Sequence, residues 1–207
     1  LMQYVKQNVM RFSVVVLFLF LTIVAYGQTH KDSVLTFQKE LNELYANPNK
    51  TPLLAKDLKT FEAHPFFEPN ETFRVKAKLE RVENALPFFM KTTTDRLPKY
   101  QLYGVATFEI NGESFQLSLY QRLVFGKVAK EANQLFLPFT DLTNGHGTYD
   151  GGRFMDIEIP MGDTLVIDFN RAYNPYCAYN PIYSCPIPPK ENHLETEILA
   201  GVQYGGH

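Results

Sequence analysis

A run of polar side chains follows one short apolar segment of the chain. Alternation within residues 164–169 places the apolar side chains on one face of a strand, so Asp168 and Asn170 are expected together on the other. A carboxylate beside an amide, followed by Arg171, could orient a polar or anionic ligand. The same groups could instead serve the structure, with Asp168 accepting bonds from an arginine or from turn amides.

Arg153 is a charge that strand alternation points inward. Counting back from Met155 and Ile157 places it on the apolar face, at its mouth. A charge in that position needs a partner, and we predict Asp168 as that partner. The pair would form either a structural ion pair or an anion-binding site.

A glycine-rich loop spans residues 140–152. It lacks the lysine-serine ending of a phosphate loop and the glycine spacing of a dinucleotide-binding turn, and it is expected to join two strands. Nucleotide binding is therefore not favoured. A loop that wraps a small ligand and a plain connection both remain open.

Both cysteines lie in one loop rich in proline and tyrosine, residues 168–189. In an exported chain the spacing of Cys177 and Cys185 favours a disulfide, which is worth ~2.5 kcal/mol by the loop-entropy estimate. A thiol nucleophile lacks a cysteine-histidine signature, and the scattered histidines offer no compact metal spacing. We therefore predict no metal and no cofactor. The tyrosines of the loop either stack on a flat ligand or pack as loop residues.

The elements that position these groups change character along the chain. Residues 32–45 have helical apolar spacing, with Asp32 or Ser33 as the N-cap, and a second short helix is expected over residues 53–61. From Thr72 the period becomes two, which predicts strands over residues 72–80, 106–110, 115–119, 135–139, 154–159 and 164–169. Asn111-Gly112 predicts a tight hairpin, and residues 160–163 predict a second one.

The start of the sequence has the pattern of a secretory signal. Lys6 and Arg11 precede an apolar run over residues 14–24, and Ala25-Tyr26-Gly27 offers small residues at a cleavage site. The run is shorter than the ~20 residues that span a bilayer, so a cleaved signal is favoured over a retained anchor. We expect a signal peptide at 1–27, export to the periplasm or medium, and no membrane span after cleavage.

Charge excludes one class of partner. The net charge is −2, and the cations of residues 74–78 alternate along one expected strand face. Nucleic-acid binding usually needs a concentrated basic surface, so no nucleic-acid partner is expected.

Two long segments carry a family resemblance. LFLPFTDLTNGHGTYDGGRFMDIEIP and DTLVIDFNRAYNPYCAYNPIYSCPIPPKENHL resemble the domain-of-unknown-function 1684 family, as do KDLKTF and the charged strand after FEPNETF. The resemblance implies an exported or cytosolic bacterial domain with no established activity. The motif covers Arg153, Asp168, Asn170, Arg171, Tyr173, Asn174, Cys177, Tyr179, Cys185, Glu191 and Asn192.

These observations predict one mainly β unit, residues 28–207. It comprises a helical arm at 28–65 and an antiparallel β-barrel or sandwich-like domain at 66–207. The function expected first is an exported module that binds a small polar or anionic ligand between the two loops. The alternatives are a hydrolase with Asp168 or Glu191 as general acid or base, and a non-catalytic structural or interaction protein. The candidate ligand-binding residues are Asp141, Thr143, Tyr149, Arg153, Asp168, Asn170, Arg171, Tyr173, Asn174, Tyr179, Glu191 and Asn192.

Overall fold

The computed structural model describes residues 30–124, 127–128 and 134–204. The expected signal peptide, 1–27, lies outside the described residues. Within them an N-terminal helix (residues 30–46) and α2 (Ala55–Leu58) precede a set of strands. The strands are β1 (Arg74–Arg81), β2 (Phe88–Phe89), β3 (Lys99–Ile110), β4 (Glu113–Val124), β5 (Lys127–Val128), β6 (Gln134–Asp141), β7 (Arg153–Glu158), β8 (Thr164–Asp168) and β9 (His193–Leu194). In this part of the chain, no helix has the length and apolar character needed to cross a membrane.

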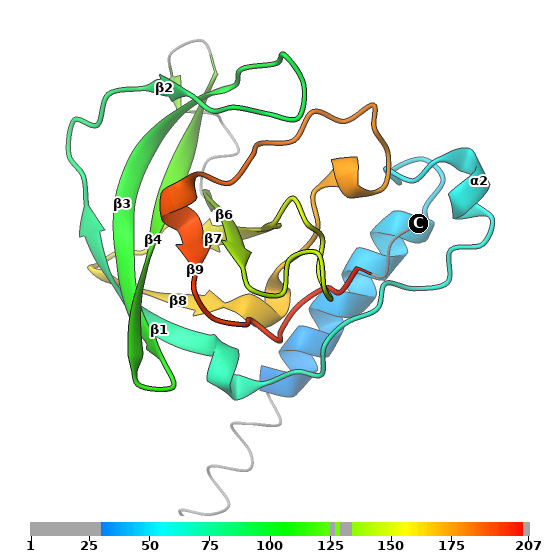
Figure 1. Ribbon diagram of the computed structural model, residues 1–207, viewed down its shortest axis with the longest axis horizontal. Helices are drawn as coiled ribbons and strands as arrows, with labels where there is room; N and C mark the ends of the chain where they lie inside the picture. The colour runs from blue at the N-terminus through cyan, green and yellow to red at the C-terminus, as the bar shows by residue number, and fades with distance from the viewer. Residues whose placement is uncertain (1–29, 125–126, 129–133, 205–207) are drawn as a thin grey trace, which may run out of the picture.

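The strands form one curled, mainly antiparallel sheet (Figure 1). Its order is β7-β6-β4-β3-β1-β8, with β2 added to β3 and β5 to β4, and β9 pairs in parallel with β6. The sheet curls into a half-barrel, because β7 and β8 are its two ends and do not pair with each other among the described residues. The predicted mainly antiparallel β fold with an N-terminal helix is confirmed.

The hairpin predicted at Asn111-Gly112 is confirmed. Ile110 pairs with Glu113, and Asn111 and Gly112 both have positive φ, at 52° and 85°. Positive φ at both central residues is the geometry of a tight turn that matches the twist of its strands. The strands on either side are longer than the alternation indicated, at 12 residues each.

The second predicted hairpin is wrong. β7 pairs with β6, and β8 pairs with β1, so the link between them crosses from one end of the sheet to the other. The amide of Leu79 in β1 donates to the carbonyl of Asp163 at 2.7 Å and fixes this crossing. A turn signal between two alternating segments does not reveal whether the second strand folds back or continues around a curled sheet.

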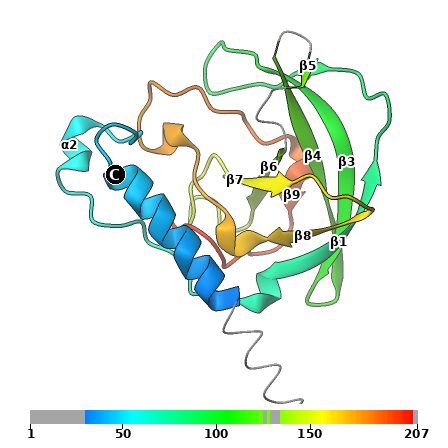
Figure 2. The same cartoon turned by 180° about the vertical axis from the view of Figure 1, so that it is seen from behind.

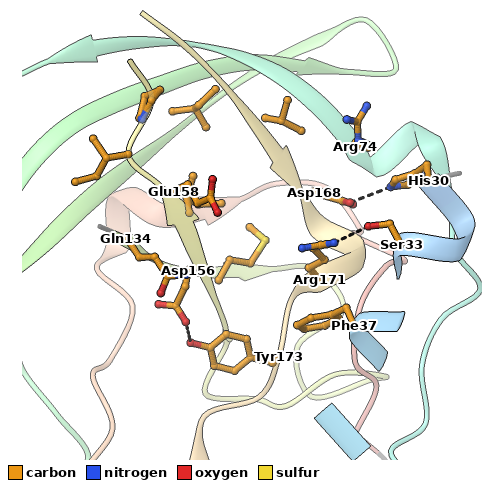
Figure 3. A pocket seen from close by; sticks show the side chains of 16 residues that line it. His30, Ser33, Phe37, Arg74, Gln134, Asp156, Glu158, Asp168, Arg171 and Tyr173 are labelled. Atoms are coloured by element: carbon orange, nitrogen blue, oxygen red, sulfur yellow. Dashed lines mark hydrogen bonds and ion pairs between the residues drawn. The ribbon is translucent and has the colours of Figure 1, made fainter. Parts of the chain in front are cut away.

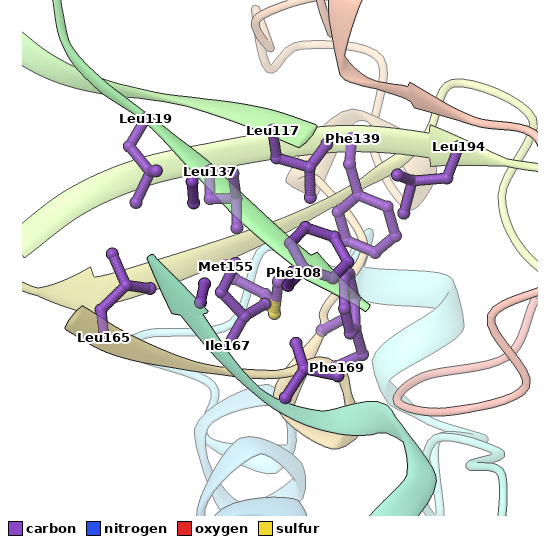
Figure 4. Close-up of a cluster of buried hydrophobic side chains, with 14 of the residues drawn as sticks. Phe108, Leu117, Leu119, Leu137, Phe139, Met155, Leu165, Ile167, Phe169 and Leu194 are labelled. Carbon is purple, nitrogen blue, oxygen red and sulfur yellow. The ribbon is translucent and has the colours of Figure 1, made fainter. Parts of the chain in front are cut away.

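The core fills the concave side of the sheet (Figure 4). Phe108 and Phe139 come from β3 and β6, and Phe169 directly follows β8; the centre of the Phe169 ring lies 5.8 Å from that of Phe108 and 5.2 Å from that of Phe139. Leu117, Leu137 and Ile167 are fully buried beside them. Burial of each such side chain stabilises the fold by ~1.5–3 kcal/mol, so this cluster is the main source of stability.

The buried side-chain amide of Asn192 takes the place of some of the backbone hydrogen bonds between β4 and β6. The two strands share one backbone pair, Tyr120 with Phe136, and Pro138 has no N–H to extend it. Asn192 fills this position: its side-chain oxygen accepts from Ser118 N–H at 2.8 Å, and its amide nitrogen donates to the carbonyls of Ser118 and Pro138. The C-terminal segment is therefore part of the sheet's hydrogen bonding.

The N-terminal helix lies on the side of the molecule away from β3 and β4, next to β8 (Figures 1 and 2). Its described part starts at residue 30, two residues before the predicted start, and buries Val34 and Tyr45. The second predicted helix is only the single turn of α2, although Leu58 and Phe61 still pack near Tyr45.

Candidate functional site

A cleft of about 760 Å³ lies between the two ends of the half-barrel, β7 and β8 (Figure 3). The N-terminal helix closes one side of it. The lining residues are His30, Ser33, Phe37, Arg74, Gln134, Met155, Asp156, Ile157, Glu158, Ile159, Pro160, Leu165, Val166, Asp168, Arg171 and Tyr173. The cleft exists because the sheet does not close, so two strand edges and one helix provide its walls.

One wall is acidic. Asp156 and Glu158 alternate along β7 with the more buried Met155 and Ile157. The hydroxyl of Tyr173 donates to Oδ2 of Asp156 at 2.7 Å. Partial burial in the cleft raises the pKa of Asp156, and the bond from Tyr173 acts in the opposite direction. Asp156 is therefore easier to protonate than an ordinary aspartate.

The facing wall is basic. Arg171 follows β8, donates to Ser33 Oγ at 2.7 Å and holds its guanidinium carbon 5.7 Å from the centre of the Phe37 ring. Arg74 of β1 lies on the same side in Figure 3. Arg171 stays exposed, and its planar guanidinium can bind a carboxylate or phosphate with two parallel hydrogen bonds.

The base of the N-terminal helix is attached to this wall through His30. Its two ring nitrogens lie 2.9 Å from Glu71 Oε1 and 2.9 Å from Asp168 Oδ2. The other oxygen of Asp168 accepts from the backbone and side chain of Asn170. Asp168 therefore lines the cleft and also holds the helix against the end of β8.

Arg153 is buried as predicted, but its predicted partner is wrong. Its guanidinium is 0% exposed and donates to Asp141 Oδ2 at 2.8 Å, and to the carbonyls of Ile198 and Ala200. Burial lowers the pKa of Arg153, and Asp141 opposes this effect. Alternation correctly pointed Arg153 inward, but it could not show that Asp141, twelve residues earlier on the neighbouring strand, ends beside it.

The glycine-rich loop is folded onto itself and does not line the cleft. The side chain of Asp141 accepts from the amide and hydroxyl of Thr143, while Asn144 bonds to Thr148 and to the carbonyl of Tyr149. Asp141 and Thr143 are buried in this network. The burial of these two side chains does not favour the predicted site between this loop and the cysteine loop, which stays a prediction.

Five more of the predicted ligand-binding residues, Asn170, Asn174, Tyr179, Glu191 and Asn192, make hydrogen bonds within the fold. Asn170 makes two bonds to the backbone of Asn70, and Asn174 donates to the hydroxyl of Tyr179 at 2.9 Å. Glu191 accepts from Tyr120 at 3.0 Å. Asn192 bridges β4 and β6, as described above. Of the twelve predicted residues, the cleft brings together Asp168, Arg171 and Tyr173.

Cys177 and Cys185 are neighbours with free thiols. The amide of Cys177 donates to Sγ of Cys185 at 3.1 Å, but no bond joins the two sulfurs. The disulfide stays a prediction. Within the described residues no group of three or more histidine, cysteine, aspartate or glutamate side chains is placed to hold a metal ion.

The sequence reasoning missed Asp156, Glu158, Arg74 and His30. Arg74 stands on the alternating basic face of residues 74–78, which the sequence indicated to be solvated, and Asp156 and Glu158 stand on the polar face of β7, which the sequence reasoning did not consider. The available signal was that Asp156 and Glu158 lie two residues apart in an alternating segment, which indicates that they share one face of a strand.

The fold and the cleft define a class of small half-barrel β-domain with an open edge covered by an N-terminal helix. The chain belongs to the family described as "Protein of unknown function (DUF1684)", whose match spans residues 59–203. It is similar, at 31% identity and a TM-score of 0.67, to the solution NMR structure of an uncharacterized protein of Haloarcula marismortui. The likeness covers 86% of this chain and 95% of that one. Among curated proteins no relative matches the sequence.

Proposed function

We propose that the protein binds a small polar ligand with an anionic group in the cleft between β7 and β8. Its volume of about 760 Å³ falls in the ~300–1,000 Å³ range of small-molecule sites. Arg171 would bind the anionic group, while Asp156 and Glu158 opposite would accept N–H or O–H groups. The opposite charges on facing walls are the observation that supports this proposal.

The test has two parts. Native mass spectrometry of protein from its producing cells should detect a co-purified small molecule, and thermal unfolding should be shifted by a member of a panel of carboxylates, sugar acids and phosphates. Arg171→Gln should weaken binding about tenfold or more, because a charge-assisted hydrogen bond is worth ~1.5–3 kcal/mol. Arg122→Gln, an exposed arginine on β4, is the matched control. Full binding by Arg171→Gln would contradict the proposal.

A second candidate is hydrolysis with Asp156 as general acid. The raised pKa of Asp156 in a cleft is the observation that favours it, since catalytic acids are commonly shifted in this direction. Asp168 and Glu191, the carboxylates that the sequence suggested, are bonded to His30 and Asn170 and to Tyr120. Asp156→Asn separates the candidates, because it should retain binding of the anionic group and abolish any turnover.

We also propose export to the periplasm or medium, with 1–27 removed and a Cys177–Cys185 disulfide in the exported form. The charged start, the short apolar run and the closeness of the two thiols support this. N-terminal sequencing of the mature protein should begin near Gln28, and alkylation without reduction should leave both cysteines unmodified. An intact chain in the cytosol with two alkylated cysteines would contradict it.

A further inference from the structure

The loop that carries the cysteines is closed by hydrogen bonds that do not need a sulfur–sulfur bond. Thr93 N–H donates to the carbonyl of Cys185 at 3.0 Å, and the guanidinium of Arg96 donates to the carbonyl of Ser184 at 2.6 Å. These bonds fix Cys185 while its thiol is free. The pair can therefore be oxidised or reduced without a change in how the loop docks.

The two thiols differ in access. Cys185 is buried, with 6% of its surface exposed, whereas Cys177 is only partly covered. A reagent that arrives from solvent therefore meets Cys177 first, and the protein itself shields Cys185.

Polar groups of three residues lower the pKa of Cys177. The thiol of Cys185 has the largest effect, followed by the hydroxyls of Tyr149 and Thr93, and burial acts in the opposite direction. The Thr93 hydroxyl also accepts from the amide of Cys185 at 3.2 Å, which orients its proton away from that amide. The bond to Cys177 and burial raise the pKa of Cys185. The thiolate form is therefore favoured at Cys177, the more accessible of the two thiols.

We infer that Cys177 and Cys185 form a thiol–disulfide exchange site, in which Cys177 attacks a small disulfide and Cys185 resolves the intermediate. This rests on the proposed Cys177–Cys185 disulfide and is independent of the ligand in the cleft. Sγ of Cys177 bonds to one sulfur of the oxidant, and the other sulfur leaves as a thiolate that takes a proton. Cys185 then loses its proton to water, attacks Sγ of Cys177 and displaces the second thiol. Two protein thiols are oxidised while one disulfide becomes two thiols.

The backbone assists the second step. The amide of Cys177 already donates to Sγ of Cys185 at 3.1 Å, so the charge that develops on Cys185 meets a donor in place. The same contact directs the sulfur of Cys185 toward Cys177 rather than toward solvent.

The test uses glutathione disulfide as the oxidant and intact mass spectrometry as the readout. Cys185→Ser should accumulate one glutathionyl group on Cys177, while Cys177→Ser should acquire it at least tenfold more slowly. Wild-type protein should end with an internal disulfide and no adduct, and reduced glutathione in excess should reverse this. Thermal unfolding of each variant establishes that it is folded.

A matched pair of variants tests whether the hydroxyl of Thr93 promotes the reaction of Cys177. In the Cys185→Ser background, Thr93→Val should slow adduct formation roughly three- to tenfold, because it removes a hydroxyl that lowers the pKa of Cys177. It also removes the acceptor of the residue 185 amide, so thermal unfolding must show that the variant keeps its fold. Thr94→Val removes a hydroxyl bonded to Ser184 in the same segment and should have no effect.

Equal reactivity of Cys177→Ser and Cys185→Ser would overturn the inferred order. An internal disulfide in the wild type without a trapped adduct in Cys185→Ser would leave the disulfide proposal standing and end the exchange inference.

Discussion

Several polar residues of the family motif are bonded within the fold and are not available to a ligand. Arg153 and Asp141 are the clearest pair, because both are buried and the carboxylate also accepts from Thr143 and from the amide of Ile198. A buried charge that loses its partner costs far more than the pair contributes. Substitution of these residues is therefore expected to lower the stability of the fold, whatever its effect on function.

Arg153→Met should lower the free energy of unfolding by about 3–5 kcal/mol, since it leaves Asp141 charged and buried. Arg153→Met combined with Asp141→Leu should recover part of this loss, because no charge then remains in the core. Urea unfolding measures both variants. Arg122→Met, on the exposed side of β4, should change stability by less than ~0.5 kcal/mol. A single Arg153→Met variant as stable as the wild type would contradict the structural role.

Asp156 should give a pH-dependent effect with a defined sign. Its pKa in the folded protein is raised, so the charged form opposes folding above that pKa, and the cost disappears below the unfolded pKa of ~3.9. Asp156→Asn should therefore raise the unfolding temperature at neutral pH, and the difference should vanish as the pH approaches about 4. Asp95→Asn, in an exposed loop, is the control. A variant less stable than the wild type at neutral pH would show that the charge stabilises the fold.

At the scale of elements, the sequence predicted the type of secondary structure of each segment more accurately than its place in the sheet. Alternation located β1, β6, β7 and β8 to within a few residues, and Asn111-Gly112 correctly predicted the tight hairpin between β3 and β4. Alternation describes a strand's two faces but not its neighbours, so the link over residues 160–163 was assigned to a hairpin. The half-barrel follows from pairings between distant segments, such as β1 with β8, which carry no local signal.

The amide of Asn192 completes the sheet between β4 and β6. Asn192→Ala removes three bonds and strands Ser118 N–H in the interior, so we expect a loss of ~2–4 kcal/mol. Hydrogen exchange should show the amide of Ser118 to be far less protected in the variant. Asn49→Ala, in an exposed turn, is the control. Unchanged protection at Ser118 would mean that the strands pair without this side chain.

At the scale of the molecule, the cleft is a consequence of an unclosed sheet. Sequence reasoning found three of its residues because Asp168, Arg171 and Tyr173 follow a strand in a polar cluster. It could not find His30 or Arg74, since only the curl of the sheet brings the N-terminal helix and β1 to β7 and β8. The predicted boundary between a helical arm at 28–65 and a β domain at 66–207 stays a prediction.

We expect the described residues to unfold as one unit. The N-terminal helix is tied to the cysteine loop by the rings of Tyr45 and Tyr179, 5.2 Å apart, and to β8 through His30. Far-UV circular dichroism and the near-UV tyrosine signal should therefore give the same midpoint in urea, with a slope of ~1–3 kcal/mol/M. A separate transition of the tyrosine signal would show that the helix and loop unfold before the sheet.

The late position of Asn192 affects the order in which the protein can be built. The bridge between β4 and β6, the carbonyls that hold Arg153, and β9 all come from residues 190–200, which follow β1 to β8 in the sequence. A ribosome synthesises these residues after the strands, so a nascent chain that stops before them has most of the sheet but lacks the groups that satisfy its interior. We therefore expect the native state to form only once residues 190–200 are available. If the protein is exported as proposed above, this delay would keep the chain translocation-competent.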